Sequence, residues 1–285
     1  MSSETATRPR PRILLNVPIL NEIENIERLV TGVARSLQGY DYVLLIVDDG
    51  STDGTIDYLQ RAMSAHEGRI ALLQRKKGRH GCQRGGALLA GLEWGLDNGD
   101  FDVFVELDGD LSHRTEELPH GIEAITRNLG DVAIVSKYVP GSRITGRTIG
   151  RTLISLICNI AVRTLIRWKI RDFSNGYRFY NRAAAEIIPV HVIRYGSPIY
   201  LSEVMAIWLD HGLRVMEIPG HYVGRNEGLS KVRLIDYIEA SIGVIEIAWR
   251  YHVTGFRRVA EEHARPAAAP GPTAKPAGIL DERDG

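Results

Sequence analysis

The chain has 285 residues, 44% of them hydrophobic and 25% charged, with a formal net charge of +0. This composition is typical of a soluble globular protein, and the length allows one α/β domain or one domain plus an appendage. A balanced charge argues against a global field for binding nucleic acid or anionic membranes. Nothing about Cys82 and Cys158 indicates a zinc site or a disulfide framework, which favours a reducing compartment.

The N-terminal segment Met1–Arg12 is polar and basic, without the apolar stretch of a signal peptide. No segment reaches the ~20 apolar residues that a membrane-spanning helix needs. Thr152–Val162 comes nearest, and Arg163 and Arg167 cut it short. We therefore expect a cytoplasmic protein, either free or peripheral at the cytoplasmic face of a membrane.

Apolar runs alternate with amphipathic helical patterns through the first half. The runs are Arg12–Val17, Tyr42–Val47, Ile70–Leu73, Phe101–Leu107 and Asp131–Ser136. Pro18 follows the first run and is expected to end that strand. This alternation predicts an α/β fold with a mostly parallel sheet flanked by helices, whose ligands bind beyond the carboxyl ends of the strands.

The second half is less regular. Helices are predicted over Leu153–Ile166, Ile199–Leu209 and Leu234–Trp249, a loop leading into a strand over Asp172–Tyr180, and a strand over Leu213–Ile218. The first and last of these helices are amphipathic, and they either pack into the core or lie on a lipid surface flanked by arginines. Residues 1–11 and the Ala- and Pro-rich tail 264–285 are predicted to be disordered, on either side of a domain at 12–256.

Asp108-Gly109-Asp110 directly follows the run Phe101–Leu107. Two carboxylates at the end of a buried strand are costly unless a cation meets them. Mg²⁺ or Mn²⁺ suits such a pair and usually keeps substrate phosphates as further ligands. The motif therefore predicts a metal–diphosphate site, with an Asp-Gly turn as the alternative.

Other polar motifs also follow strands. Pro18 to Glu22 comes after the first run, and Asp48-Asp49-Gly50-Ser51 after the second. Arg75–Gly86, basic and Gly-rich, comes after the third. This last segment can meet an anion at a helix N-terminus, or it is a solvated loop.

In this order the motifs resemble the family 2 glycosyltransferases, whose fold is the Rossmann-like GT-A fold. The residues that carry the resemblance are Pro18-x-x-Asn21-Glu22, Val47-Asp48-Asp49-Gly50-Ser51 and Asp108-Gly109-Asp110-Leu111-Ser112-His113. Asp172-Phe173-Ser174-Asn175-Gly176-Tyr177-Arg178 and Arg225-x-x-Gly228-x-Ser230-Lys231 are similar to segments of the polyprenyl-phosphate sugar synthases, with the dolichyl-phosphate mannose synthases nearest.

The resemblance implies a nucleoside-diphosphate sugar donor, inversion at the anomeric carbon, and Mg²⁺ or Mn²⁺ held by Asp108 and Asp110. Glu22 and Asp49 are the implied contacts to base or ribose, and Lys137, Arg225 and Lys231 the cations for phosphate groups. The implied donor-binding residues are Pro18, Leu20, Asn21, Glu22, Val47, Asp49, Asp108, Gly109 and Lys137. Leu20 and Lys137 stand where the family usually has Tyr and Arg, and Lys lacks the bidentate guanidinium.

The acceptor is open at this point. A polyprenyl monophosphate is already anionic and needs no strong base, whereas a hydroxyl acceptor needs a carboxylate. Asp172 and Glu203 are the candidate bases, with Asp110, Arg225 and Lys231 completing the predicted catalytic set. As structural alternatives, Asp172 caps a helix or lies on the surface, and Glu203 is an ordinary helical residue.

Two other functions compete with transfer to a lipid phosphate. One is a glycosyltransferase for a soluble small molecule or natural product. The other is a nucleotidyltransferase, although its Gly-rich, basic signature after the first strand is absent here. Peripheral membrane contact and a homo-oligomer are both open.

Overall fold

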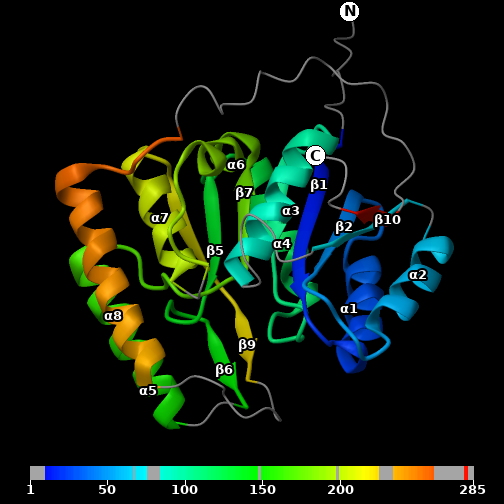
Figure 1. Cartoon of the computed structure of the whole chain (residues 1–285), viewed down its shortest axis with the longest axis horizontal. Coiled ribbons are helices and arrows are strands. Elements are labelled where there is room, and N and C mark those ends of the chain that lie inside the picture. The colour runs from blue at the N-terminus through cyan, green and yellow to red at the C-terminus, as the bar shows by residue number, and fades with distance from the viewer. Residues whose placement is uncertain are drawn as a thin grey trace, which may run out of the picture.

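The computed structural model describes residues 10–66, 68–75, 84–146, 149–196, 199–224, 234–259 and 279–281. Eight strands form one sheet in the order β10-β3-β2-β1-β4-β7-β5-β8 (Figure 1). They are β1 (Arg12–Ile19), β2 (Asp41–Asp48), β3 (Ile70–Gln74), β4 (Val103–Glu106), β5 (Val132–Ser136), β7 (Arg178–Asn181), β8 (Val215–Pro219) and β10 (Ile279–Asp281). Only β7 runs antiparallel to its neighbours, so the predicted mostly parallel sheet is confirmed.

Helices cover both faces of this sheet. The first face carries α1 (Ile23–Ser36), α2 (Thr55–Ala65) and α4 (Leu118–Thr126), and the second carries α3 (Arg84–Asn98), α6 (Arg182–Ile187) and α7 (Tyr200–Asp210). Short 3₁₀ turns, η1 (Thr115–Glu117) and η2 (Ile188–Val190), adjoin α4 and α6. Side chains alternate along each strand, so Leu14 packs in one core and Leu15 in the other. This double coverage is why the strands read as continuous apolar runs.

Two long helices lie side by side beyond the β8 edge of the sheet (Figure 1). They are α5 (Ile149–Leu165) and α8 (Leu234–Trp249), and α8 continues into a π-helical turn, η3 (Arg250–Thr254). A second, two-stranded parallel sheet joins β6 (Arg143–Thr145) to β9 (His221–Val223). Among the described helices, none combines the length and apolar character needed to cross a membrane.

The prediction that Pro18 ends the first strand is wrong. β1 continues to Ile19, and Pro18 lies opposite Val47 of β2. The Ile19 carbonyl accepts from the Asp49 N–H (3.2 Å), so the backbone of Pro18 faces the β4 side. Pairing with β4 has already ended at Asn16, and a missing N–H costs no ladder bond there.

The predicted tail 264–285 lies mostly outside the described residues. Its described part, Ile279–Asp281, pairs in parallel with β3 as an edge strand. Of the N-terminal segment 1–11, only the last two residues are described, immediately before β1.

Candidate active site

The carboxyl ends of β1, β2, β4 and β5 open at one edge of the sheet. Because β7 is antiparallel, the loop 172–177 that precedes it reaches the same edge. The strand order thus gathers loops that are far apart in the chain, in the place where ligands bind open α/β sheets.

Asp108 and Asp110 lie in the tight loop that follows β4, each partly exposed. Gly109 between them packs against the end of β1, where a Cβ would come within 2.8 Å of Ile19 Cγ2. Asp110 Oδ1 accepts from the backbone N–H of Ser112 (2.9 Å). Both predicted carboxylates therefore share one short, sterically restricted loop.

The buried side chain of His113 holds this loop by a hydrogen bond to its backbone. Its buried ring accepts, at Nδ1, the backbone N–H of Asp108 (3.1 Å), so the proton sits on Nε2, 3.0 Å from Asn175 Oδ1. The ring also stacks on Tyr177, with 4.9 Å between centroids. Burial lowers the pKa of His113. A neutral His113 thus ties the Asp108 loop to the 172–177 loop.

Arg84 is a site residue that the sequence motifs missed. Its Nε lies 2.7 Å and its Nη2 2.6 Å from Asp108 Oδ1. Gly176 makes room for the guanidinium, because a Cβ at that position would lie 1.8 Å from Nη2. The available signal was its place at the end of the basic, Gly-rich segment Arg75–Gly86, at the first residue of α3.

Asp172 and Lys137 form a second cluster at this edge. The fully buried Asp172 carboxylate accepts the backbone N–H groups of Lys137, Ser174 and Asn175 at 3.0–3.1 Å. Lys137 Nζ lies 3.9 Å from Asp172 Oδ2 and 5.2 Å from the centroid of the Tyr222 ring. In this arrangement Asp172 orders its loop and positions Lys137.

The motifs after β1 and β2 are joined by hydrogen bonds. The Asn21 N–H donates to Ser51 Oγ and Asn21 Oδ1 accepts from Thr52 N–H, both at 2.8 Å. The Glu22 carboxylate accepts from Asn25 Nδ2 (2.7 Å). Asn21 has a positive φ of 57°, which Asn tolerates better than most residues. Asn21 therefore joins the two loops, and the Glu22 carboxylate is held by Asn25 at the start of α1.

Of the two adjacent aspartates after β2, Asp48 points inward and accepts from the N–H groups of Gly50 and Ser51. Asp49 pairs with Arg75 at 2.7 Å, with both side chains largely buried. Val47 is buried in β2 beside Pro18, and Leu20 is 54% exposed at the tip of the first loop.

Glu203 lies in α7, where its buried carboxylate forms an ion pair with Arg250 (2.5 Å). It also accepts from the N–H groups of Arg194 (3.0 Å) and Tyr195 (3.1 Å). These contacts engage the Glu203 carboxylate with Arg250 and with the backbone of residues 194 and 195. Arg225 and Lys231 lie outside the described residues.

The donor set at Asp108 and Asp110 fits a hard divalent cation. The described part of the chain contains no cluster of three or more His, Cys, Asp or Glu side chains suited to a metal. Ser112 Oγ is buried there without a hydrogen-bond partner among the described residues. Two carboxylates that leave the other positions to waters and phosphates are what Mg²⁺ favours.

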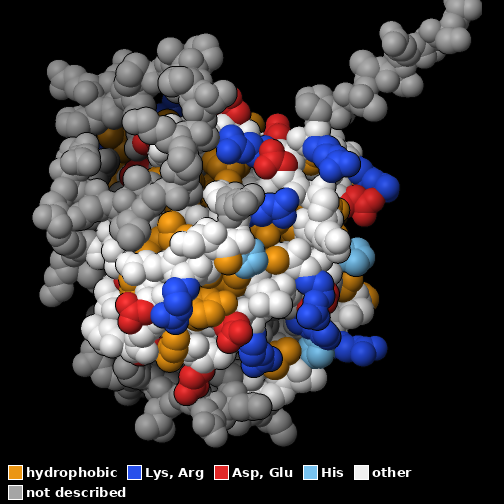
Figure 2. Space-filling view, turned by 90° about the vertical axis from the view of Figure 1, so that its right-hand side faces the viewer, with side chains coloured by type: hydrophobic (Ala, Val, Ile, Leu, Met, Phe, Trp, Pro, Cys, Tyr) orange, Lys and Arg blue, Asp and Glu red, His pale blue; other side chains and the backbone are white. Residues whose placement is uncertain are grey.

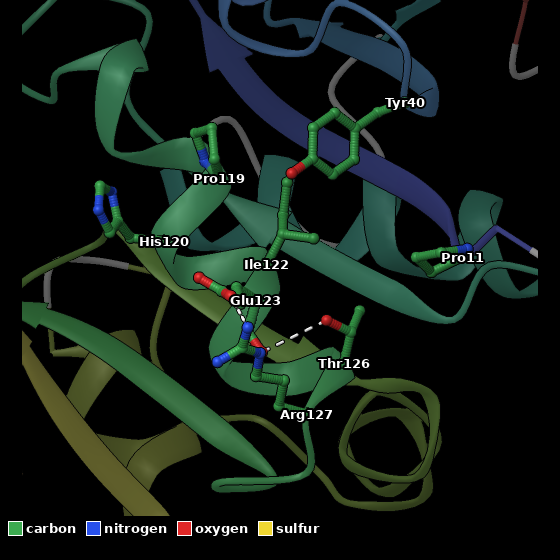
Figure 3. A pocket seen from close by; sticks show the side chains of 8 residues that line it. All are labelled: Pro11, Tyr40, Pro119, His120, Ile122, Glu123, Thr126 and Arg127. Carbon is green, nitrogen blue, oxygen red and sulfur yellow. Dashed lines mark hydrogen bonds and ion pairs between the residues drawn. The ribbon is translucent and has the colours of Figure 1, made fainter.

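A cavity of about 430 Å³ lies away from this site (Figure 3). It is lined by Pro11, which precedes β1, by Tyr40, by α4 residues that include Glu123, and by Arg127, which directly follows α4. These side chains border the amino end of β1, whereas the predicted residues follow the carboxyl ends.

The sheet topology and the paired carboxylates after a central strand define an α/β protein of the GT-A class. Residues 15–188, more than half of the chain, match the family model described as glycosyl transferase family 2. The chain belongs to this family, as its motifs predicted.

Three curated relatives support this assignment. Polyprenol monophosphomannose synthase of Mycolicibacterium smegmatis is 34% identical over 84% of this chain and 88% of its own length. Undecaprenyl-phosphate mannosyltransferase of Micrococcus luteus is 32% identical over 78% and 87%. Dolichol-phosphate mannosyltransferase of Pyrococcus furiosus is 30% identical over 78% of this chain and 59% of its own length.

Among solved structures, glucosyl-3-phosphoglycerate synthase of Mycobacterium tuberculosis, in complex with Mn²⁺, UDP and glucosyl-3-phosphoglycerate, has a TM-score of 0.58. The match covers 85% of this chain and 80% of that one at 17% sequence identity. This likeness supports the fold.

Proposed function

We propose that this chain is an inverting glycosyltransferase that moves a sugar from a nucleoside-diphosphate sugar to the phosphate of a polyprenyl monophosphate. Membership of glycosyl transferase family 2 supports the transfer. The names of the three relatives refer to a polyprenol or its phosphate, which supports the lipid acceptor, and each name also refers to mannose or a mannosyl group. One structural observation supports a lipid acceptor. One side of α5 contacts the candidate site, and the other side is an exposed apolar surface.

The polar side of α5 contacts the site. Ser155 Oγ lies 2.9 Å from the Tyr138 hydroxyl, next to Lys137. One turn further, Asn159 Nδ2 donates to Ser174 Oγ (2.9 Å) in the loop that holds Lys137. The helix thus packs its polar residues against the loops that would receive an acceptor phosphate.

The opposite side of α5 is apolar and open to solvent. Leu153, Ile157 and Ile160 are 43–64% exposed, and Ile242, Ile245 and Trp249 of the adjacent α8 are 59–63% exposed. We call these six residues the apolar face. Exposed cations follow both helices, namely Arg167, Lys169, Arg171, Arg257 and Arg258. An apolar surface flanked by cations suits the interface of an anionic bilayer, which is where a polyprenyl chain resides.

Charges of both signs are spread over the α1–α2 end of the molecule instead (Figure 2). Membrane contact is proposed at the α5–α8 side, through the apolar face.

The chemistry follows from the residues at the sheet edge. An acceptor phosphate oxygen forms the bond to the anomeric carbon while the bond from that carbon to the donor diphosphate breaks, and the nucleoside diphosphate leaves with the electron pair. The attacking oxygen is anionic near neutral pH, so no general base is needed. The positions of Asp172 and Glu203 agree with this, since both carboxylates are buried and already accept several hydrogen bonds.

On the donor side, Asp108 and Asp110 would hold Mg²⁺ or Mn²⁺, which supplies charge stabilisation to the leaving diphosphate. The Mn²⁺ and UDP in the Mycobacterium tuberculosis structure support a divalent cation. Glu22 and Asp49 are proposed to contact base or ribose, and Arg75 holds the Asp49 carboxylate in place. Arg225 and Lys231 remain predicted to supply positive charge to the phosphate groups.

The first test of the proposed function is a screen of UDP- and GDP-sugars, mannosyl donors first, with Mg²⁺ or Mn²⁺. We expect nucleoside diphosphate to be released only when polyprenyl phosphate is present, and the labelled sugar to partition into butanol. If the labelled sugar is transferred to a soluble acceptor and stays in the aqueous phase, the enzyme is a glycosyltransferase for soluble acceptors and not for a lipid phosphate. Release of pyrophosphate would instead identify a nucleotidyltransferase.

Lys137→Met should lower kcat/KM by about 10- to 100-fold, equivalent to the ~1.5–3 kcal/mol of a hydrogen bond to a charged group. Lys137 is held beside Asp172 at the sheet edge where the acceptor phosphate and the donor diphosphate are proposed to bind. Lys137→Arg keeps the charge and should retain most of the activity. If Lys137→Met has the same kcat/KM as the unmodified enzyme, Lys137 does not contact the substrates.

Replacing both Ile157 and Ile245 by Asp should abolish co-sedimentation with anionic phospholipid vesicles. Burying each isoleucine in the interface contributes about 1.5–3 kcal/mol, so affinity should fall at least ~100-fold. Leu129→Asp is the matched control, because Leu129 is 60% exposed in the turn between α4 and β5. Vesicle binding equal to that of the control would disprove membrane contact through the apolar face.

A further inference from the structure

Four charged side chains of alternating sign connect the core to the carboxylate loop. Arg178 of β7 lies opposite Glu106 of β4, and both are fully buried. Two residues beyond Glu106, Asp108 forms an ion pair with Arg84 of α3. Burial raises the pKa of Glu106, and the positive charges of Arg178 and then Arg84 oppose that rise. Arg84 is therefore within electrostatic reach of both carboxylates.

Backbone packing sets the position of Arg84. A Cβ at Gly176 would overlap its Nη2, and a Cβ at the neighbouring Gly85 would come within 2.9 Å of the Gly196 carbonyl oxygen and the Tyr200 ring. The Gly85 N–H also donates to the Gly196 carbonyl (2.9 Å). The start of α3 is thus held against Gly196 and the start of α7, and Gly176 in the loop 172–177 leaves room for the guanidinium beside Asp108.

This position conflicts with a metal at the same carboxylate. Arg84 Nε and Nη2 both contact Asp108 Oδ1, so a divalent cation on Asp108 would face a second positive charge within contact distance. Glu106 Oε2 is buried with no hydrogen-bond partner among the described residues, so the core behind the loop carries a further carboxylate whose charge Arg84 opposes.

We propose that Arg84 is a built-in counter-cation that competes with the divalent metal for Asp108, so that metal binds tightly only together with a diphosphate. The negative charge of the diphosphate offsets the repulsion between Arg84 and the metal. Metal and nucleotide then favour each other's binding by the same factor. This inference rests on the metal–diphosphate site of the proposed function and adds a residue that controls its loading.

The test is a titration of the full chain with Mn²⁺, monitored through the electron paramagnetic resonance of free Mn²⁺, with and without GDP or UDP. In Arg84→Gln the affinity for Mn²⁺ alone should rise about 10-fold, within the range of ordinary coupling between sites. The enhancement of Mn²⁺ binding by nucleotide should shrink by the same factor. Asp108→Asn should lose Mn²⁺ binding under both conditions.

Gly176→Ala provides a second variant that keeps the arginine. Its Cβ would push the flexible guanidinium away from Asp108, so Mn²⁺ affinity should rise as in Arg84→Gln. Arg182→Gln is the matched control, since Arg182 begins α6 and pairs with Glu186 at 2.8 Å. Melting temperatures identify any variant that fails to fold.

Unchanged or weaker Mn²⁺ binding by folded Arg84→Gln and Gly176→Ala, measured without nucleotide, would overturn the inference. Absence of Mn²⁺ binding by the unmodified protein with nucleotide would overturn both the inference and the metal site. If Mn²⁺ affinity changes as expected but no polyprenyl phosphate is glycosylated, the role of Arg84 is supported and polyprenyl phosphate is rejected as the acceptor.

Discussion

Asp110→Asn is expected to lower kcat by at least ~10³-fold, because a metal that polarises a leaving diphosphate contributes several kcal/mol to the transition state. Asp110 lies on the loop after β4, where its described role in the fold is to accept the Ser112 N–H. Asn keeps a side-chain oxygen that can accept this N–H, so the melting temperature should change by at most a few degrees. Removal of divalent cations with EDTA should reproduce the loss, and added Mn²⁺ should restore the unmodified enzyme.

Asp100→Asn is the matched control for this experiment. Asp100 is exposed at the opposite end of β4, with a long 3.8 Å contact to Arg182, and such surface pairs contribute little. Its activity should equal that of the unmodified chain. Turnover by Asp110→Asn, or by the unmodified chain in metal-free buffer, at the normal rate would show that these carboxylates do not hold a required metal.

Arg250→Met is expected to reduce the free energy of unfolding by about 3–5 kcal/mol, the usual cost of removing one partner of a buried ion pair. Arg250 is 4% exposed, follows α8, and pairs with the fully buried Glu203 of α7 at 2.5 Å. Without Arg250, the Glu203 carboxylate is buried without its counter-charge. Urea unfolding monitored by circular dichroism measures the loss.

The deficit of Arg250→Met should depend on pH with a defined sign. Burial raises the pKa of Glu203, and the hydrogen bond and charge of Arg250 oppose that rise. Removing Arg250 therefore raises this pKa further, so the folded variant binds a proton that the unfolded chain releases. That contribution is present below the ordinary Glu pKa and is lost as pH rises through the folded value, which makes the deficit smaller at about pH 5 than at about pH 7.5.

The double variant Glu203→Gln with Arg250→Met removes both charges and should recover much of the stability. If Arg250→Met alone unfolds at the same urea concentration as the unmodified protein, the Glu203–Arg250 pair does not hold α8 to α7. The apolar face would then have to be positioned by other contacts of α8.

Local pattern was sufficient to predict the sheet and the edge at which the polar motifs lie. Strands buried on both faces appear as continuous apolar runs, so β2, β3 and β5 were predicted within a residue or two. The carboxyl ends of parallel strands meet at one edge, so motifs that follow strands had to converge. The small sheet of β6 and β9 was not predicted, because three-residue strands such as Arg143–Thr145 carry too little pattern.

Partners across the fold depend on packing that no local pattern encodes. Asp108-Gly109-Asp110 and its place after a buried strand were determined by the sequence itself, because chain connectivity attaches the motif to β4. That Arg84 meets Asp108 was decided by the tertiary structure, since Gly176, far along the chain, leaves the space for the guanidinium. Asp172 and Glu203 were both acidic candidates in the sequence, and only their burial and long-range partners separate an Asp that holds Lys137 from a Glu paired with Arg250. Charge and hydrogen-bonding capacity belong to the residue, whereas desolvation and the identity of the partner are properties of the fold.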